Sequence, residues 1–449
     1  MSIKLAFKLM VIGVVTGVIL IALAMVNSTI TDRQAYRDEA VKSIEASYAG
    51  PQTVIGPVLV RPYTETTVTM VDEGKGTKKP VEHVAQMFAT SFPHVLDVSG
   101  KLSPTERRHG LYKVTVYELS GQLKGAVDVT EPQTTGKIEW GEPYLAMSVT
   151  DVRGIVGTPR VLVNGTPQTM LQGADSTTMG WQPNLRVPLQ GVKDIHGHLE
   201  FAIDMDLAGT EQLSVAPVGD SNHVELNSAW PSPLFAGQFL PRTRDVGANR
   251  FTAAWDISSL AAGTQMQMQS APAKQIDLMN VSLLTPIDPY KLSDRATKYG
   301  ILFVLLTFGG FFLFEMIKQL PIHPVQYLLV GFALAIFFLL LISFSEHIAF
   351  AVAYLISSAA CIGLLTFYLS YVLRSVARGL SFGGMLTALY GAVYGLLISE
   401  DNALILGSIL LFAVLATVMV VTRRVDWYRS GVGGATPPGS HAPLQGLGL

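Results

Sequence analysis

The chain has 449 residues, of which 49% are hydrophobic and only 15% are charged. Together with a mean hydropathy of +0.37, these values argue against an ordinary soluble protein and favour a membrane protein. The formal net charge of -2 provides no basic surface of the kind that binds nucleic acid, so we expect no nucleic-acid partner. Cys361 is the single cysteine, which excludes disulfides within the chain and cysteine-based metal sites.

The N-terminal segment predicts a membrane anchor over residues 1–27. Lys4 and Lys8 precede an apolar run at 9–26 that is long enough to cross about 30 Å of hydrocarbon as a helix. A secretory signal peptide stays open as an alternative, because Ala22 and Ala24 form an A-x-A pattern. With either interpretation, the chain after residue 27 is exported. The charged residues 28–48 keep a largely helical spacing of apolar positions and predict a helix that stops at Gly50-Pro51.

From residue 53 the hydrophobic period changes to two, which indicates β-strands. Strands are predicted at 53–63, 95–102, 111–119, 144–152, 160–163, 195–207, 211–218, 223–227, 250–257 and 277–284. Asn164-Gly165 favours a tight hairpin, since a type I′ turn needs positive φ at both central residues. Residues 71–80 are predicted to be a solvated polar loop. We therefore expect residues 28–298 to form a large, mainly antiparallel, sandwich-like β domain on the exported side.

The predicted strand at 195–207 alternates most cleanly, with Leu199, Phe201 and Ile203 on one face. The other face carries His196 and His198, a geometry that could present two imidazoles to Zn²⁺ or Cu²⁺. The alternative is the wet face of an amphipathic strand, which this pattern favours. His196 and His198 are thus a weak metal candidate, and no cofactor is expected.

Apolar blocks at 299–320, 325–344, 348–369, 382–398 and 403–421 predict a five-helix transmembrane bundle at 299–421, and six spans with the anchor. Basic residues decide its orientation, since short cytoplasmic loops carry them in excess. Those in the short loops and next to the chain ends fall on one side: Lys4, Lys8, Lys318, Arg374, Arg378, Arg423 and Arg424. Both termini are therefore predicted to be cytoplasmic. The Gly- and Pro-rich tail at 422–449 is predicted to be disordered.

Polar residues near the spans are candidates for a functional site, because a charge in hydrocarbon is costly. They are Glu315, His323, Glu346, His347, Glu400 and Asp401. The alternatives are an ion pair of Glu315 with Lys318, a solvated loop for His323, and ordinary polar turns for the others.

In the β region, Trp230, Phe235 and Phe239 form a proline-rich aromatic segment that could contact a partner, or could instead fill the core. The GxSxG match at 379–383 falls in a predicted turn between two spans, whereas a nucleophile elbow needs a strand before the serine. No enzyme activity is predicted.

Several stretches resemble the CreD family of bacterial inner membrane proteins. They include LSVAPVGDSNHVELNSAWPSPLFAGQFLP, HPVQYLLVGFALAIFFLLLISFSEHIAF, LYGAVYGLLISEDNALILGS and TRRVDWY, within a resemblance that covers residues 1–428. The resemblance implies a Gram-negative inner membrane protein with a periplasmic domain, associated with envelope integrity, stress response and altered tolerance to colicins and β-lactams. It supplies no catalytic residues.

Two functions are therefore considered as hypotheses. The first is a non-enzymatic envelope-integrity protein, whose periplasmic domain binds a protein or envelope component while the bundle contacts the lipid bilayer. The alternative is a transporter or lipid-handling protein that acts through the bundle.

Overall fold

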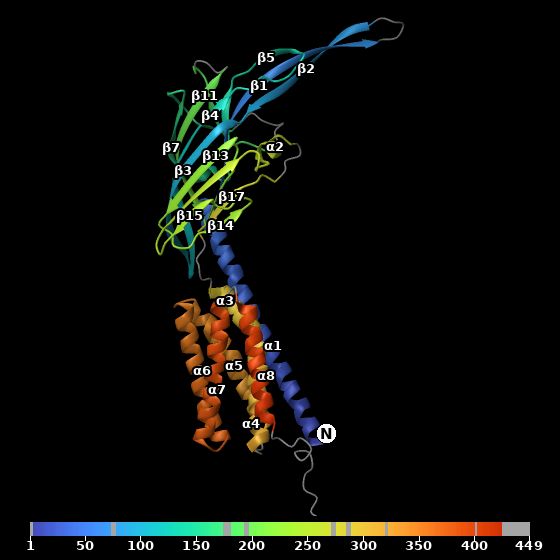
Figure 1. Ribbon diagram of the computed structural model, residues 1–449, viewed down its shortest axis with the longest axis vertical. Helices are drawn as coiled ribbons and strands as arrows, with labels where there is room; N and C mark the ends of the chain where they lie inside the picture. Colours follow the sequence, from blue (N-terminus) through green and yellow to red (C-terminus); the bar gives the residue numbers. More distant parts are fainter. Residues whose placement is uncertain are drawn as a thin grey trace, which may run out of the picture. The chain divides into compact units, whose positions relative to one another are not determined.

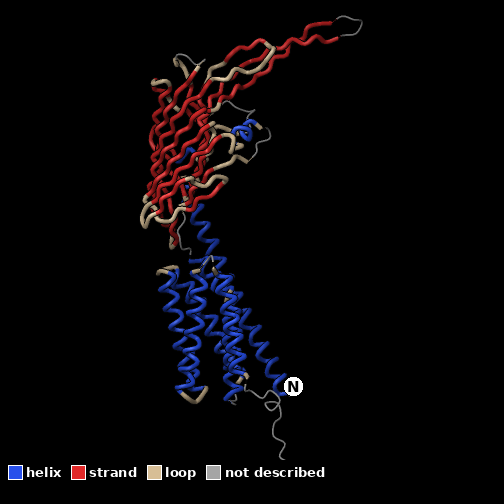
Figure 2. The backbone as a smooth tube through the Cα atoms, viewed as in Figure 1, coloured by secondary structure: helices blue, strands red, loops and turns tan. Residues whose placement is uncertain are grey.

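The computed structural model describes residues 3–72, 78–173, 181–192, 197–270, 275–283, 289–318, 322–399 and 402–423. It divides into two compact units, one formed by Met1–Tyr36 with Ile287–Leu449 and the other by Arg37–Pro286. The first is helical and the second is mainly β (Figures 1 and 2). Helix α1 (Ile3–Ser47) contributes to both units, which confirms that the predicted helix at 28–48 continues directly from the apolar run.

The β unit is a sandwich of two sheets. The nine-stranded sheet has the order β14-β17-β12-β1-β6-β10-β9, with β2 and β5 also paired to β1. Its strands are β1 (Gln52–Asp72), β2 (Lys78–Ser91), β5 (Lys137–Trp140), β6 (Tyr144–Val149), β9 (Leu171–Gln172), β10 (Leu185–Pro188), β12 (Gln212–Val215), β14 (Leu234–Gly237) and β17 (Met279–Ser282). Helix α2 (Thr264–Gln269) precedes β17 in the chain.

The eight-stranded sheet has the order β15-β16-β13-β3-β4-β11-β7-β8. Its strands are β3 (Pro93–His109), β4 (Tyr112–Asp128), β7 (Ile155–Val163), β8 (Thr166–Gln168), β11 (His198–Thr210), β13 (Ser221–Ser228), β15 (Thr243–Val246) and β16 (Phe251–Ser258). Among the described strands, β1 pairs in parallel with β12 and β3 with β13, while the other pairings are antiparallel. The predicted, mainly antiparallel sandwich is confirmed, with mixed sheets.

The core of the sandwich follows the predicted alternation. Every second residue of β11 is buried in one apolar cluster, to which both sheets contribute side chains: Leu199, Phe201, Ile203, Met205 and Leu207. The residues between them include the exposed acids of the outer face. The predicted hairpin is also confirmed, since Asn164 and Gly165 have φ of 48° and 73° between β7 and β8.

The first two strands form a hairpin that is much longer than predicted. β1 continues to Asp72 and β2 begins at Lys78, so the prediction of a solvated loop is wrong for residues 71–72 and 78–80. Residues 73–77 lie outside the described residues. The far part of the hairpin extends beyond the other strands of the sandwich (Figure 2). Val68, Met70 and Val84 are exposed there. The threonine- and valine-rich sequence of this part favours strand, but only its pairing with β2 decides that it forms one.

A buried side chain at the start of β1 connects three segments of the sandwich. Gln52 is 0% exposed, and its amide nitrogen Nε2 donates hydrogen bonds to Asp151 O at 2.9 Å and Ala208 O at 3.0 Å. Its Oε1 accepts from Asp151 N at 3.1 Å. Arg153 donates to the α1 carbonyl of Ala46 at 2.7 Å, and its hydrogen bond to Asp151 lowers the pKa of that carboxyl. We call these contacts the Gln52 network.

The helical unit contains the predicted bundle. After α3 (Pro289–Lys298) come α4 (Gly300–Lys318), α5 (Pro324–Ser345), α6 (Phe350–Val372), α7 (Val376–Ile398) and α8 (Ala403–Thr422). Four helices, α1, α5, α6 and α7, are long and apolar enough to span a membrane, and the pair of α3 and α4, bent by 41°, would be a fifth. Helix α8 is apolar over the shorter stretch Leu404–Val420.

The GxSxG match lies in a helix and not in the predicted turn. α7 begins at Val376, and Gly379 and Gly383 lie one turn apart on its side toward α6. A Cβ atom at Gly379 would clash with Ser370, and one at Gly383 would clash with Thr366. Small residues four apart let two membrane helices approach closely. The match is therefore a helix-packing motif, which we call the α6–α7 glycine contact.

Candidate functional site

The buried carboxylate of the helical unit is Glu315, near the end of α4. It is 7% exposed and forms an ion pair with Lys8 of α1. The hydroxyl of Tyr327 donates to its Oε2 at 2.9 Å, and the backbone N–H of Ile322 to its Oε1 at 3.3 Å. The expected partner was Lys318, whose side chain lies outside the described part of the chain. The described partners come from α1, from α5 and from Ile322 just before α5, and sequence spacing could not reveal them.

A second buried carboxylate follows the C-terminal end of α5. The side chain of Glu346 is 8% exposed, faces Arg33 of α1 at 3.5 Å, and accepts a hydrogen bond from the Tyr290 hydroxyl at 3.5 Å. Lys8 and Arg33 are about 37 Å apart along α1 at 1.5 Å of rise per residue. A hydrocarbon core is about 30 Å thick, so the separation along α1 is somewhat larger than the distance between its two boundaries.

The other described polar candidates, His323 and His347, lie at opposite ends of α5. His323 caps α5, since its Nδ1 accepts from Val325 N at 3.3 Å. His347 is exposed in the turn that follows α5. Glu400, Asp401 and Arg424 lie outside the described residues, as do the tail beyond Arg423 and the side chain of Lys4.

The aromatic segment packs on the sandwich. Trp230, Phe235 and Phe239 are half-buried against the apolar core. Phe235 meets Phe251 edge to face at 5.7 Å between ring centroids, and Trp255 Nε1 donates to Phe239 O at 3.1 Å. These contacts support the core-filling alternative. A role of the segment in partner binding stays a prediction.

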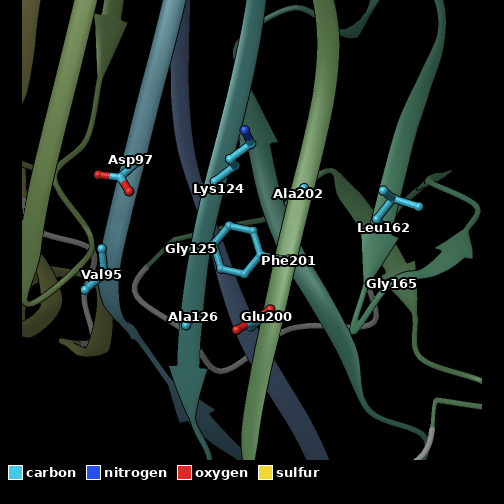
Figure 3. A pocket seen from close by; sticks show the side chains of 10 residues that line it. All are labelled: Val95, Asp97, Lys124, Gly125, Ala126, Leu162, Gly165, Glu200, Phe201 and Ala202. Atoms are coloured by element: carbon cyan, nitrogen blue, oxygen red, sulfur yellow. The ribbon is translucent and has the colours of Figure 1, made fainter.

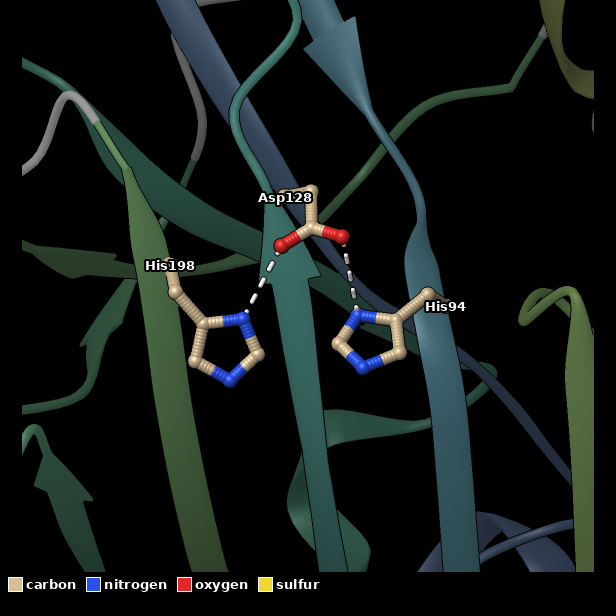
Figure 4. Close-up of side chains that lie close together, drawn as sticks. All are labelled: His94, Asp128 and His198. Atoms are coloured by element: carbon tan, nitrogen blue, oxygen red, sulfur yellow. Dashed lines mark hydrogen bonds and ion pairs between the residues drawn. The ribbon is translucent and has the colours of Figure 1, made fainter.

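A cluster of two histidines and one aspartate lies on three neighbouring strands, β3, β4 and β11 (Figure 4). His198 begins β11 directly opposite Asp128, the last residue of β4, and its Nδ1 is 2.9 Å from Asp128 Oδ1. His94, near the start of β3, has its Nδ1 3.5 Å from Asp128 Oδ2. The hydrogen bond with His198, and then the charges of the two histidines, lower the pKa of the Asp128 carboxyl. We call these three residues the His-Asp-His cluster.

The structure changes the predicted pair of histidines. His196 lies outside the described residues, and the residues beside His198 are His94 and Asp128. Sequence reasoning missed both, because neither the strand order β3-β4-β11 nor the position of His94 could be read from local periodicity. The sequence offered one signal for this site: His94 stands directly before the strand predicted at 95–102.

An open hollow of about 400 Å³ lies beside the His-Asp-His cluster (Figure 3). Its lining mixes charged and apolar groups: Val95, Asp97, Lys124, Gly125, Ala126, Leu162, Gly165, Glu200, Phe201 and Ala202. Glu200 Oε1 is 4.0 Å from His198 Nε2, so the hollow and the cluster are adjacent. The hollow is open, and Asp97, Lys124 and Glu200 give it charges of both signs.

A simpler histidine–aspartate pair occurs on the same sheet. His223 on β13 is opposite Asp256 on β16, with Nδ1 2.7 Å from Oδ1. The hydrogen bond with Asp256 raises the pKa of His223. Burial opposes this, and the charges of Asp256, Asp97 and Glu225 add to the increase. In this pair a single histidine forms one hydrogen bond with an aspartate on the neighbouring strand.

Comparison with known proteins assigns the chain to a family. The family described as inner membrane protein CreD matches residues 4–428, nearly the whole sequence. The chain belongs to the CreD family. The inner membrane protein CreD of Escherichia coli (strain K12) is 35% identical to this CreD-family chain over 420 residues, which cover 91% of each protein. The resemblance seen in the sequence is thereby confirmed, and with it an inner membrane protein with several membrane-spanning helices.

Among solved structures, the M1 zinc metallopeptidase of Deinococcus radiodurans is 12% identical to the CreD-family chain, with a TM-score of 0.22. The match covers 43% of this chain and 42% of the peptidase. A likeness this weak carries no argument about activity.

Proposed function

We propose that this protein supports the integrity of the cell envelope as a non-enzymatic inner membrane protein, and that its β sandwich binds a protein or another envelope component in the periplasm. The observation that carries the proposal is the match to the CreD family over residues 4–428, which includes both the membrane helices and the sandwich. A compact unit of the size of Arg37–Pro286 exceeds what membrane anchoring requires. It is the part available for binding.

The proposal places both termini in the cytoplasm. Lys8, Arg374, Arg378 and Arg423 would then lie on the cytoplasmic side, as the positive-inside rule requires. The ion pair of Lys8 with Glu315 supports this, because it joins the N-terminal end of α1 to the C-terminal end of α4. Lys291, Arg295 and Lys298 would lie on the other side, but they come after a long exported segment, where basic residues have little influence on topology.

Cysteine labelling tests this orientation. In a Cys361→Ala background, we expect a membrane-impermeant maleimide to label His347→Cys in cells whose outer membrane alone is permeabilised. Ala377→Cys, which is exposed at the other end of the bundle, should react only after the inner membrane is disrupted. Neither substitution removes a positive charge. Labelling of Ala377→Cys first would reverse the proposed topology.

Removal of the sandwich tests the function. In a strain that lacks the gene, we expect the full chain to restore the wild-type tolerance to β-lactams and colicins, and a chain with residues 37–286 replaced by a short Gly/Ser linker to restore none of it. Immunoblots of the inner membrane must show equal amounts of both proteins. Full rescue by the shortened chain would contradict the proposal and point to the bundle.

The contacts of the buried carboxylates bear on the alternative of transport through the bundle. Glu315 and Glu346 are each paired with a basic side chain of α1 and a tyrosine hydroxyl. Through these contacts, both carboxylates link α1 to other segments of the helical unit. They support the envelope proposal, in which the bundle has a structural role, over transport.

A further inference from the structure

We infer that His94, Asp128 and His198 form a binding site for a divalent transition metal ion of the zinc class. Each residue can offer one ligand atom, and these three atoms lie within 4.8 Å of one another. The side chains come from three adjacent strands and converge at one point on the sheet (Figure 4). The inference is independent of the proposed envelope function.

The ligand set and its spacing fit zinc. Imidazole nitrogens and a carboxylate oxygen are its usual ligands, at about 2.0–2.2 Å, so ligand atoms around a tetrahedral ion are roughly 3.4 Å apart. Asp128 oxygens lie 2.9 Å and 3.5 Å from the Nδ1 atoms of His198 and His94. These separations, and the 4.8 Å limit for all three ligand atoms, are close to those around one ion. Three protein ligands leave a fourth position for water or a polar group.

A β-bulge aims His94 at this point. Pro93 pairs with Val127 and Val95 with Ala126, so His94 is an extra residue without a partner on β4. Along β3, Leu96 and Val98 are buried, and strict alternation would turn residue 94 inward as well. The bulge shifts the alternation so that His94 and Val95 both point away from the core. Bulges often redirect a side chain toward a site in this way.

The hydrogen-bonding state of His94 is the second observation. Its Nδ1 is buried, yet it has no hydrogen-bond partner among the described residues. At 3.5 Å its contact with Asp128 is long for a hydrogen bond, whereas His198 and Asp128 are properly bonded. A buried nitrogen without a partner is unfavourable, and a metal ion between the three groups would satisfy it.

The neighbouring His223 and Asp256 pair makes the contrast clear. It has the same cross-strand geometry on the same sheet, with its hydrogen bond fully formed at 2.7 Å. No second histidine belongs to a described metal-ligand group with it. The His-Asp-His cluster therefore differs from this pair by its second histidine, which is placed beside the aspartate by a β-bulge.

The test is zinc binding to the full-length, tag-free protein in detergent after treatment with a chelator. Titration with Zn²⁺, followed by calorimetry and by metal analysis after dialysis, should show a site that holds one ion per chain. His94→Ala and His198→Ala should each weaken this site by about tenfold or more, the scale seen when metal-site groups are removed. Asp128→Asn should weaken it as well. The same concentration of Zn²⁺ should also raise the melting temperature of the parent protein more than that of these variants.

His223→Ala and Asp256→Asn are the matched controls, because they remove a histidine and an aspartate from the same sheet outside the cluster. They should bind Zn²⁺ with unchanged affinity. The inference is overturned if the parent protein holds no Zn²⁺ after dialysis, or if His94→Ala and His198→Ala bind it as tightly as the two controls do. Equal melting temperatures of all proteins without metal would show that the variants are folded.

Discussion

Replacement of Gln52 by alanine should lower the free energy of unfolding of the sandwich by roughly 2–4 kcal/mol, since each buried polar group left without a partner costs about 1–3 kcal/mol. The Gln52 side chain is completely buried and makes three hydrogen bonds with backbone groups of Asp151 and Ala208. Its loss leaves two carbonyls and one N–H without these partners. The cavity left between the start of β1, Asp151 and Ala208 adds to the cost.

Urea unfolding of the full-length protein in detergent measures this change. Tryptophan fluorescence reports on the β unit, since Trp140, Trp181, Trp230 and Trp255 all lie between residues 37 and 286. The control is Gln122→Ala, which also removes a side-chain hydrogen bond, to Asp204 at 2.6 Å, but on the exposed face. It should cost less than about 1 kcal/mol. Equal effects of the two substitutions would show that the buried hydrogen bonds of Gln52 do not stabilise the sandwich.

Gly383→Leu should destabilise the packing of α6 against α7 by about 1–3 kcal/mol or more, the usual cost of forcing extra atoms into a packed contact. A Cβ at this position meets three atoms of the Thr366 side chain, at 3.2 Å and 3.3 Å for its Cγ2 and Cβ and closer for its Oγ1. At Gly379 the obstacle includes the Cα of Ser370, which only a backbone shift can clear. Gly379→Leu should therefore be at least as damaging.

Gly384→Leu is the control for the α6–α7 glycine contact. Gly384 is the next residue of the same helix, but a Cβ there meets no atom within 4 Å. Gly384→Leu thus makes the same change of side chain and of helix propensity as Gly383→Leu, but without a clash. Thermal unfolding in detergent should show a lower midpoint for Gly383→Leu than for Gly384→Leu. Identical midpoints would mean that the two helices do not depend on this approach.

Local patterns explain why much of the architecture was predictable. The apolar blocks that become α4 to α8, the alternation of β11 and the Asn164-Gly165 turn each depend on neighbours within a few residues. The short strands β5, β9, β10, β14 and β15 were not predicted, because they have too few residues to establish a period. β2 was missed because many of its side chains remain exposed on the projecting hairpin. Its long pairing with β1 is what makes it a strand.

The candidate sites were less predictable than the fold. Glu315 and Glu346 could be singled out as carboxylates near membrane spans, but their partners Lys8 and Arg33 come from a helix at the other end of the sequence. His198 could be placed on the wet face of a strand. Asp128 and His94 could not be placed beside it, since a strand register and a bulge decide which side chains are adjacent.

The sequence by itself determined the class of the protein and its elements: an apolar anchor, a β-rich region, a helical bundle and membership of the CreD family. Hydrophobic periodicity and turn chemistry are local, so the chain displays them without its fold. Only the tertiary structure decided which groups meet. The Gln52 network, the ion pairs of α1, the α6–α7 glycine contact and the His-Asp-His cluster all join segments that pairing and packing bring together. Their energies depend on distances that no local pattern encodes.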